Sequence, residues 1–214
     1  MKQRPILFSA PMVCALLDGT KTQTRRVAKI KRVEPHPQNP IIQVATMEGV
    51  GKQFWANSQI DHPNHISKAC PYGQVGDQLW VRETFMDMRG TGIEHDGKGD
   101  YCYRADVNDW GEESRKDYGL KWKRSIFMPR AASRITLEIT SVRVERLQDI
   151  SEADAIAEGI EEHDGGFSTY DDGIVDYTEF AEHSYRCLWE SLNGAGSWDL
   201  NPWVWVIEFK KVKP

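Results

Sequence analysis

The chain lacks long apolar runs and an excess of basic residues, and each absence argues against a class of protein. No stretch reaches the ~18 consecutive apolar residues that a membrane-spanning helix requires, and the apolar run near the N-terminus is too short for a secretory signal. There is no excess of basic residues either. The formal net charge of −5 argues against a protein that coats long nucleic acids, because such binding needs many neutralised phosphates. We therefore expect a cytoplasmic protein, and a nucleoside-sized ligand remains possible.

The cysteines are widely and irregularly spaced. His62, His65 and Cys70 give one arrangement that resembles a metal site, but this Pro- and Asn-containing loop offers no obvious fourth ligand. We predict no metal and no other cofactor. We also expect reduced thiols, because the four cysteines lie far apart and form no CxxC pair: Cys14, Cys70, Cys102 and Cys187.

The composition is that of an ordinary globular protein, with 40% hydrophobic and 28% charged residues. A chain of 214 residues can bury about 70% of the surface of its unfolded form. We predict a single domain over residues 1–214. Polar segments rich in Pro, Gly or Asp indicate insertions at about 31–72, 86–123 and 160–177, the first broken by Pro35, Pro37 and Pro40 and the last forming a mobile surface loop.

Short apolar runs and alternating patterns predict strands at 5–9, 22–30, 78–85, 135–147 and 203–209. The long fourth strand changes register near Ser141, as a bulged or bent strand does. The strand at 78–85 is expected to be central, and the last strand is apolar enough to be buried on both faces.

Three helices are predicted, over 10–18 with Ser9 as N-cap and Gly19 at its end, over 151–159 with a capping box at Ser151, and from an N-cap at Thr178. The absence of βαβ alternation favours an α+β fold, a small β-barrel with covering helices and long inserted loops. In the last helix an apolar stripe at helical spacing is expected to belong to the core: Ala181, Tyr185, Leu188, Trp189 and Leu192.

The segment Gly19-Thr20-Lys21-Thr22-Gln23-Thr24-Arg25-Arg26 brings an amine, hydroxyls and two guanidiniums to the end of the first predicted helix. Gly19 can take the positive φ that closes a helix, and the chain then leaves as an extended segment. Such a cluster suits acyl transfer or anion binding. A solvated turn is the simpler alternative.

Together these features resemble the ASCH domain, a β-barrel of the PUA-like superfamily. The resemblance is carried by the GxKxxTxR element at Gly19 to Arg26 and by short matches elsewhere: Pro5-Ile6-Leu7-Phe8, Gly76-Asp77-x-Leu79-x-Val81, the region from Leu147 to Gly159, and Val206-Ile207-Glu208-Phe209. Within the family the chain is most similar to bacterial N4-acetylcytidine amidohydrolases and to their larger phage-type and metagenomic relatives.

The resemblance implies catalytic roles for Lys21, Thr24 and Glu158, with Arg26 as the arginine of the motif. Spacing within the matched region selects Glu158 over Glu152. The implied activity is hydrolysis of the N4-acyl amide of N4-acetylcytidine or related N4-acylated cytosines, giving cytidine and a carboxylic acid. The partner would then be a small modified pyrimidine nucleoside or base, and no membrane.

Two mechanisms are open for such a site. Thr24 could attack the acyl carbon if Lys21 removes its proton, which requires burial or neighbouring cations such as Arg25 or Arg26 to lower the pKa of the lysine. Alternatively, Glu158 could activate water while Lys21 polarises the carbonyl. A third interpretation is purely structural, with Lys21 and Glu158 as an ion pair of little energetic value.

Further substrate-binding candidates lie on the predicted strand at 78–85. Trp80 and Arg82 share one face and could offer a stacking surface and a donor to a pyrimidine, with Glu83 beside them; Trp80 is equally compatible with a core position. Arg26 could bind substrate or fix the turn by donating to backbone carbonyls.

The competing hypothesis is a noncatalytic RNA-binding PUA-like module. In that case Lys21, Arg25 and Arg26 would contact phosphates and Trp80 would stack on a base.

Overall fold

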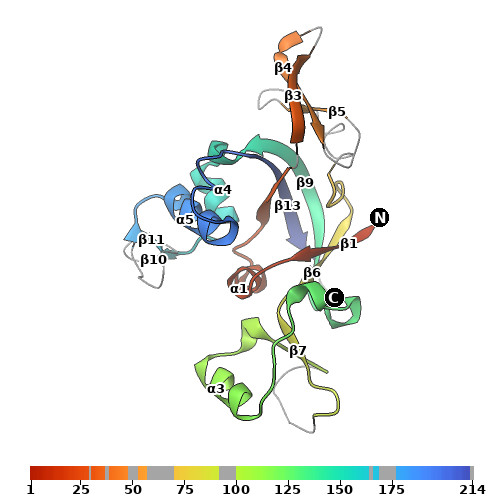
Figure 1. Ribbon diagram of the computed structural model, residues 1–214, viewed down its shortest axis with the longest axis vertical. Coiled ribbons are helices and arrows are strands. Elements are labelled where there is room, and N and C mark those ends of the chain that lie inside the picture. Colours follow the sequence, from red (N-terminus) through yellow and green to blue (C-terminus); the bar gives the residue numbers. More distant parts are fainter. Residues whose placement is uncertain are drawn as a thin grey trace.

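The structure, a computed structural model, describes residues 1–28, 30–36, 39–47, 53–56, 70–91, 100–163, 166–168 and 177–212. It confirms the α+β class. The centre is a five-stranded sheet in the order β1-β6-β9-β13-β2, in which β1 and β6 are parallel and the other neighbours antiparallel (Figure 1). These strands are β1 (Gln3–Leu7), β2 (Gln23–Val27), β6 (Gln78–Arg82), β9 (Thr136–Arg146) and β13 (Trp203–Lys211).

The two long strands β9 and β13 form the middle of this sheet. Val204 to Ile207 are fully buried, because one apolar cluster packs on each face of the sheet. The predicted change of register is confirmed. Glu208 pairs with Ser141 and Phe209 with Ile139, so β9 has one extra residue at this point, as a β-bulge requires.

Four α-helices occur in the described parts of the chain: α1 (Ala10–Asp18), α3 (Asp109–Asp117), α4 (Glu152–Ala157) and α5 (Ala181–Asn193). Figure 1 shows α4 and α5 together on one side of the curved sheet, with α3 in the excursion at the lower end. The first helix and α4 agree with prediction, although the Ser9 side chain makes no capping hydrogen bond. Four 3-10 turns complete the helical content: Arg104–Asp106, Ser125–Phe127, Arg130–Ala132 and Leu147–Asp149.

One helix start was predicted wrongly, and one helix was not predicted. Thr178 does not cap the last helix; it lies in strand β12 (Tyr177–Thr178), and α5 begins at Ala181 with Phe180 as N-cap. Helix α3 was not predicted, because it buries no residue and so lacks the apolar stripe by which a helix is detected. Its start is fixed locally by Asn108, whose side chain accepts a hydrogen bond from the backbone N–H of Gly111.

The first and third predicted insertions contain more regular structure than expected, and the second contains a hairpin, one of the two forms that its sequence suggests. The prolines at 35 and 40 do not prevent β3 (Ile30–His36) and β4 (Asn39–Met47) from forming a three-stranded sheet with β5 (Gln53–Ala56). Pro35 lies on the edge strand, next to a register shift, where a missing N–H is tolerated. The second insertion forms the hairpin β7 (Phe85–Asp87) and β8 (Tyr101–Tyr103), and the third includes β10 (Glu162–His163) and β11 (Gly166–Ser168) paired with β12.

The described residues contain neither a membrane-spanning helix nor a disulfide. Within the described ranges, no helix combines the length and the apolarity that crossing a bilayer would require. None of the four cysteines, all of which are described, takes part in a disulfide.

Candidate functional site

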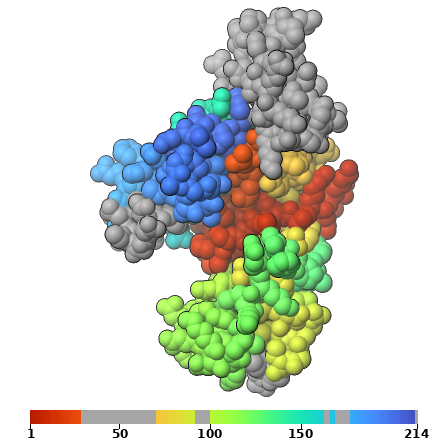
Figure 2. Space-filling model, in the orientation of Figure 1, coloured from red at the N-terminus to blue at the C-terminus, as the bar shows by residue number. Residues whose placement is uncertain are grey.

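A cavity of about 450 Å³ lies beside strand β2, within the size range of small-molecule sites. One wall comes from the end of β1 and the start of α1, including Phe8 and Met12; another comes from β2, and a third from α5. In Figure 2 the blue atoms of the region around α5 lie directly against the red and orange atoms of the N-terminal segment. Thr24, Arg26 and Glu158 all line this cavity, so three of the predicted functional residues share one site.

The segment after α1 is held by backbone hydrogen bonds. Gly19 takes φ 83° as the C-cap, the N–H of Lys21 donates to the carbonyl of Ala15 at 3.1 Å, and that of Thr22 donates to the carbonyl of Ala157 at 2.9 Å. The last bond ties the motif to the end of α4. These hydrogen bonds fix the backbone position of Lys21, just before strand β2 begins.

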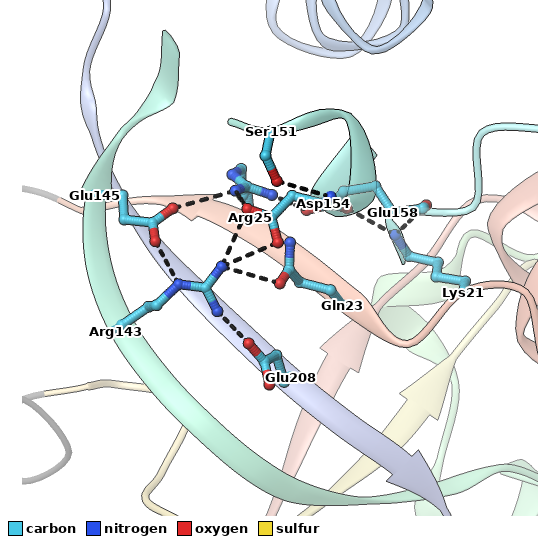
Figure 3. Close-up of polar contacts among 9 residues, drawn as sticks. All are labelled: Lys21, Gln23, Arg25, Arg143, Glu145, Ser151, Asp154, Glu158 and Glu208. Atoms are coloured by element: carbon cyan, nitrogen blue, oxygen red, sulfur yellow. Dashed lines mark hydrogen bonds and ion pairs between the residues drawn. The ribbon is translucent and has the colours of Figure 1, made fainter. Parts of the chain in front are cut away.

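Lys21 is completely buried and bound to Glu158 by two hydrogen bonds (Figure 3). Its Nζ donates to Oε2 of Glu158 at 2.8 Å and to the main-chain carbonyl of the same residue at 2.6 Å. Nζ also lies 5.7 Å from the centre of the Phe8 ring. Lys21 is not among the described residues that line the cavity; it lies next to Glu158, which does.

Glu158 is presented by the C-terminal end of α4. The helix begins with Ser151, whose hydroxyl accepts a hydrogen bond from the N–H of Asp154, and Glu158 is its C-cap before Gly159 at φ 91°. Glu152, the rejected alternative, instead accepts a hydrogen bond from the N–H of Ala181 on α5. The preference for Glu158 over Glu152 agrees with the contact to Lys21.

Burial is the main effect on the protonation of Lys21. Burial lowers the pKa of the amine, Glu158 raises it, and Arg26 and Arg25 lower it further, so that it lies below its usual value. A neutral amine still has two N–H groups, which match the two acceptor atoms of Glu158, and it keeps a lone pair. A lowered pKa is one requirement for Lys21 to act as a base.

Thr24 and Arg26 project from the same face of β2. Thr24 is 1% exposed and pairs with Ile207, while Arg26 pairs with Trp205. Nη2 of Arg26 donates to the carbonyl of Leu7 at 2.7 Å, so the arginine has the structural contact expected of it and also lines the cavity.

Several buried polar atoms near the cavity have no hydrogen-bond partner among the described residues. Oε1 of Glu158 has no donor, although Nη1 of Arg25 lies 3.6 Å away, and Nε1 of Trp189 has no acceptor. Nη1 and Nε of Arg25 also donate to no described atom. Because buried polar groups are usually paired, these atoms are candidates for ligand contacts.

Trp80, Arg82 and Glu83 are not among the described residues that line the cavity. The guanidinium of Arg82 lies 5.1 Å from the Trp80 ring, which agrees with their predicted common face, and its Nε donates to the carbonyl of Met128. Glu83 is 1% exposed and accepts two hydrogen bonds from Arg134. These contacts explain the three residues structurally, and their role in substrate binding stays a prediction without geometric support.

No group of three or more potential metal ligands occurs in the described part of the chain. His62 and His65 lie outside the described residues, and Cys70 is buried.

Comparison with known proteins gave no match: no family model fits the chain, and it has no significant similarity to a curated protein or a solved structure.

The close packing at Gly159 leads to a first prediction. A Cβ at this position would lie 3.0 Å from Cβ of Ala15 and 3.1 Å from Cβ of Lys21. The Gly159→Ala variant combines this overlap with the positive φ, so we expect the free energy of unfolding to fall by about 2 kcal/mol or more. Urea unfolding measures it.

Gly19→Ala is the matched control, since Gly19 has φ 83° but no described atom within 4 Å of its Cβ position. It should lose only the backbone contribution of about 1–2 kcal/mol. Equal losses in the two variants would show that the contact with Lys21 is not tight.

Proposed function

We propose that this protein is an amidohydrolase that cleaves the N4-acyl amide of N4-acetylcytidine or a related N4-acylated cytosine. The proposal rests on one observation above all. A buried lysine and a buried glutamate are hydrogen-bonded at 2.8 Å, and the glutamate shares a cavity of about 450 Å³ with a buried threonine. The resemblance of the GxKxxTxR element to ASCH-domain amidohydrolases supports the same assignment.

In the proposed reaction, Thr24 Oγ1 attacks the acyl carbon and neutral Lys21 accepts the hydroxyl proton. The bond between the acyl carbon and N4 breaks, N4 receives a proton through the Lys21–Glu158 pair, and cytidine leaves. Water then hydrolyses the threonine ester, which releases the carboxylic acid and restores the hydroxyl. The buried pair can pass a proton without exposure to solvent, since the lysine side chain is 0% exposed.

The atoms without partners suit such a ligand. An N4-acylcytosine carries one N–H at the scissile amide and several acceptors, namely the acyl oxygen, the ring nitrogen and the ring carbonyl. Oε1 of Glu158 is placed to accept from the amide N–H, and Nε1 of Trp189 can donate to one of the acceptors. Recognition by one acceptor and one donor would orient the amide relative to Thr24.

The proposal includes the finer assignment of the fold as a PUA-like barrel. The two edge strands of the sheet, β1 and β2, both border the cavity, and Arg26 of β2 donates to the carbonyl of Leu7 in β1. A side chain therefore spans the gap between the edges, as expected where a curved sheet approaches closure.

Incubation of the purified protein with N4-acetylcytidine tests this proposal directly. We expect conversion to cytidine, followed by chromatography or by the ultraviolet shift, and a loss of about 10²- to 10⁴-fold in Lys21→Ala, the usual contribution of general acid-base catalysis. Thr22→Ala, which changes an exposed neighbour in the same segment, is the control and should keep full activity. No turnover by the wild-type protein would refute the proposal.

The RNA-binding alternative loses two of its predicted contacts. The side chains of Lys21 and Arg25 are 0% exposed and engaged with carboxylates, so they do not face a phosphate backbone. Salt-dependent RNA binding without turnover would nevertheless favour that alternative over the hydrolase.

A further inference from the structure

Arg25 occupies the variable position between Thr24 and Arg26 in the GxKxxTxR element, yet its side chain is as completely enclosed as that of Lys21. Its guanidinium is 0% exposed, and Nη2 donates to Asp154 at 3.0 Å and to Glu145 at 3.2 Å. Because side chains alternate along a strand, Arg25 projects to the opposite face of β2 from Thr24, toward α4.

The two carboxylates that hold Arg25 are themselves held by a second arginine (Figure 3). Arg143 of β9 donates to Asp154 at 3.1 Å and also to Glu145, and its remaining contacts are with Gln23 at 3.2 Å and with Glu208. Burial raises the pKa of Asp154, but Arg25 and Arg143 outweigh this effect and hold it below its usual value, so the carboxylate stays ionised. Arg25 thus sits in a fixed frame that spans β2, β9 and α4.

The other terminal nitrogen of Arg25, Nη1, lies beside Glu158. Nη1 of Arg25 lies 3.6 Å from Oε1 of Glu158, an ion-pair distance but longer than a normal hydrogen bond. The other oxygen, Oε2, is bound by Lys21. Arg25 therefore attracts Oε1 electrostatically while leaving its lone pairs available to a ligand.

We propose that Arg25, anchored by Asp154 and Glu145, is a positioning residue that fixes the carboxylate of Glu158 between Lys21 and the cavity. The inference rests on the proposed hydrolase function. A buried network of ion pairs is by itself weak evidence for stabilisation. The proposal gives the contacts of Arg143 with Asp154 and Glu145 a second role, which is to hold Arg25 in place. Among the described residues, Arg26 on β2 and Tyr185 on α5 also act electrostatically on the Lys21–Glu158 pair.

Two changes are expected in Arg25→Gln. The turnover number should fall by about 10- to 100-fold with little change in KM, because the bound substrate meets a misplaced carboxylate. The rising limb of the pH profile should also move to higher pH. Burial, opposed by Glu158, sets most of the pKa of Lys21, and Arg25 lowers it, so removing this cation raises the pKa and delays formation of the neutral base.

Arg25→Lys separates charge from geometry. It keeps a cation beside Lys21, so the rising limb should stay in place. An ammonium has only one nitrogen, so it cannot bind Asp154 and Glu145 while a second nitrogen lies beside Glu158, as Nη2 and Nη1 of the guanidinium do, and the turnover number should still fall. Arg143→Gln, in a side chain that is 28% exposed, should act in the same way by loosening Asp154 and Glu145. It provides the test if Arg25→Gln does not fold.

Arg115→Gln is the matched control. Arg115 is also largely enclosed, with 15% exposure, and pairs with Glu112 at 2.7 Å, but it lies on α3. It should lose stability without changing the turnover number or the pH profile. If Arg25→Gln behaved like this control, Arg25 would be merely structural and the inference would be overturned.

A measurement without substrate separates this inference from the proposed function. The pKa of Lys21 can be followed by NMR of labelled lysine side chains, with Lys21→Met for assignment, in the wild type and in Arg25→Gln. A higher pKa in Arg25→Gln supports the electrostatic coupling even if N4-acetylcytidine proves not to be a substrate. An unchanged pKa in a variant that folds would overturn it even if the wild type is active.

Discussion

Replacement of Thr24 by alanine is expected to lower the turnover of N4-acetylcytidine by about 10⁴-fold or more, because losing a nucleophile removes the covalent route altogether. Thr24 is 1% exposed and lines the cavity together with Glu158. Thr24→Ser keeps the hydroxyl and should retain activity within about 10-fold, since only a methyl group is lost. The structure should tolerate both changes, since each only shortens the side chain.

Mass spectrometry of a rapidly quenched reaction distinguishes this route from direct attack by water. Wild-type protein and Thr24→Ser should both carry an acetyl group on residue 24 during turnover. The route in which Glu158 activates water predicts no acyl-enzyme and only a moderate loss in Thr24→Ala. Full activity of Thr24→Ala would exclude the threonine as nucleophile and leave Glu158 as the base.

The helix ends that border this site could be predicted from the sequence, because helix capping depends on neighbouring residues. A glycine with positive φ ends α1, and a capping serine begins α4, so both ends of the Lys21–Glu158 contact are set by local structure. The resemblance of the GxKxxTxR element supplied the pairing between the two segments, which are 137 residues apart. Spacing alone does not predict such a long-range contact.

The cavity wall that α5 forms could not be predicted from the sequence. Four residues of α5 were expected to be core because they recur at helical spacing: Tyr185, Leu188, Trp189 and Leu192. Tyr185 and Trp189 are buried, but Leu192 is 51% exposed, so the core prediction was wrong for it. All four also line the cavity. The periodic pattern of an apolar stripe is the same whether the stripe meets other side chains or a ligand, so only tertiary structure separates the two.

Arg25 illustrates a second limit. The sequence places it beside Thr24 and Arg26 and suggests an electrostatic effect on Lys21, but its partners come from β9 and from α4. Ion pairs between distant segments leave no periodic pattern. Pro35 shows the converse error, because a rule that holds for central strands was applied to an edge strand with a register shift.

The Lys21–Glu158 pair provides the second large expected effect, this time on stability. Glu158→Gln leaves a buried lysine beside Arg25 and Arg26 without its carboxylate, and we expect the free energy of unfolding at neutral pH to fall by about 3–5 kcal/mol. Lys21→Met should cost less, because Arg25 still lies 3.6 Å from the remaining carboxylate. Urea unfolding at fixed ionic strength measures both.

The loss in Glu158→Gln should depend on pH. Burial and the two arginines keep the pKa of Lys21 below its usual value in the folded protein, and removing the glutamate lowers it further. The unfolded chain then binds a proton that the folded chain does not, up to the ordinary lysine pKa of about 10.4. Stability therefore rises with pH toward that value, and the deficit of Glu158→Gln relative to Lys21→Met should shrink as the pH is raised from 7 to 9.

The double variant Lys21→Met with Glu158→Gln decides why the pair is present. Because both charges are removed together, most of the stability lost in Glu158→Gln should return, to within about 1–2 kcal/mol of the wild type. The double variant should nevertheless be inactive. Recovery of stability without activity would mean that the buried pair serves chemistry rather than folding. If instead the losses of the two single variants simply add up, Lys21 and Glu158 do not interact energetically, and their contact contributes nothing to a shared proton path.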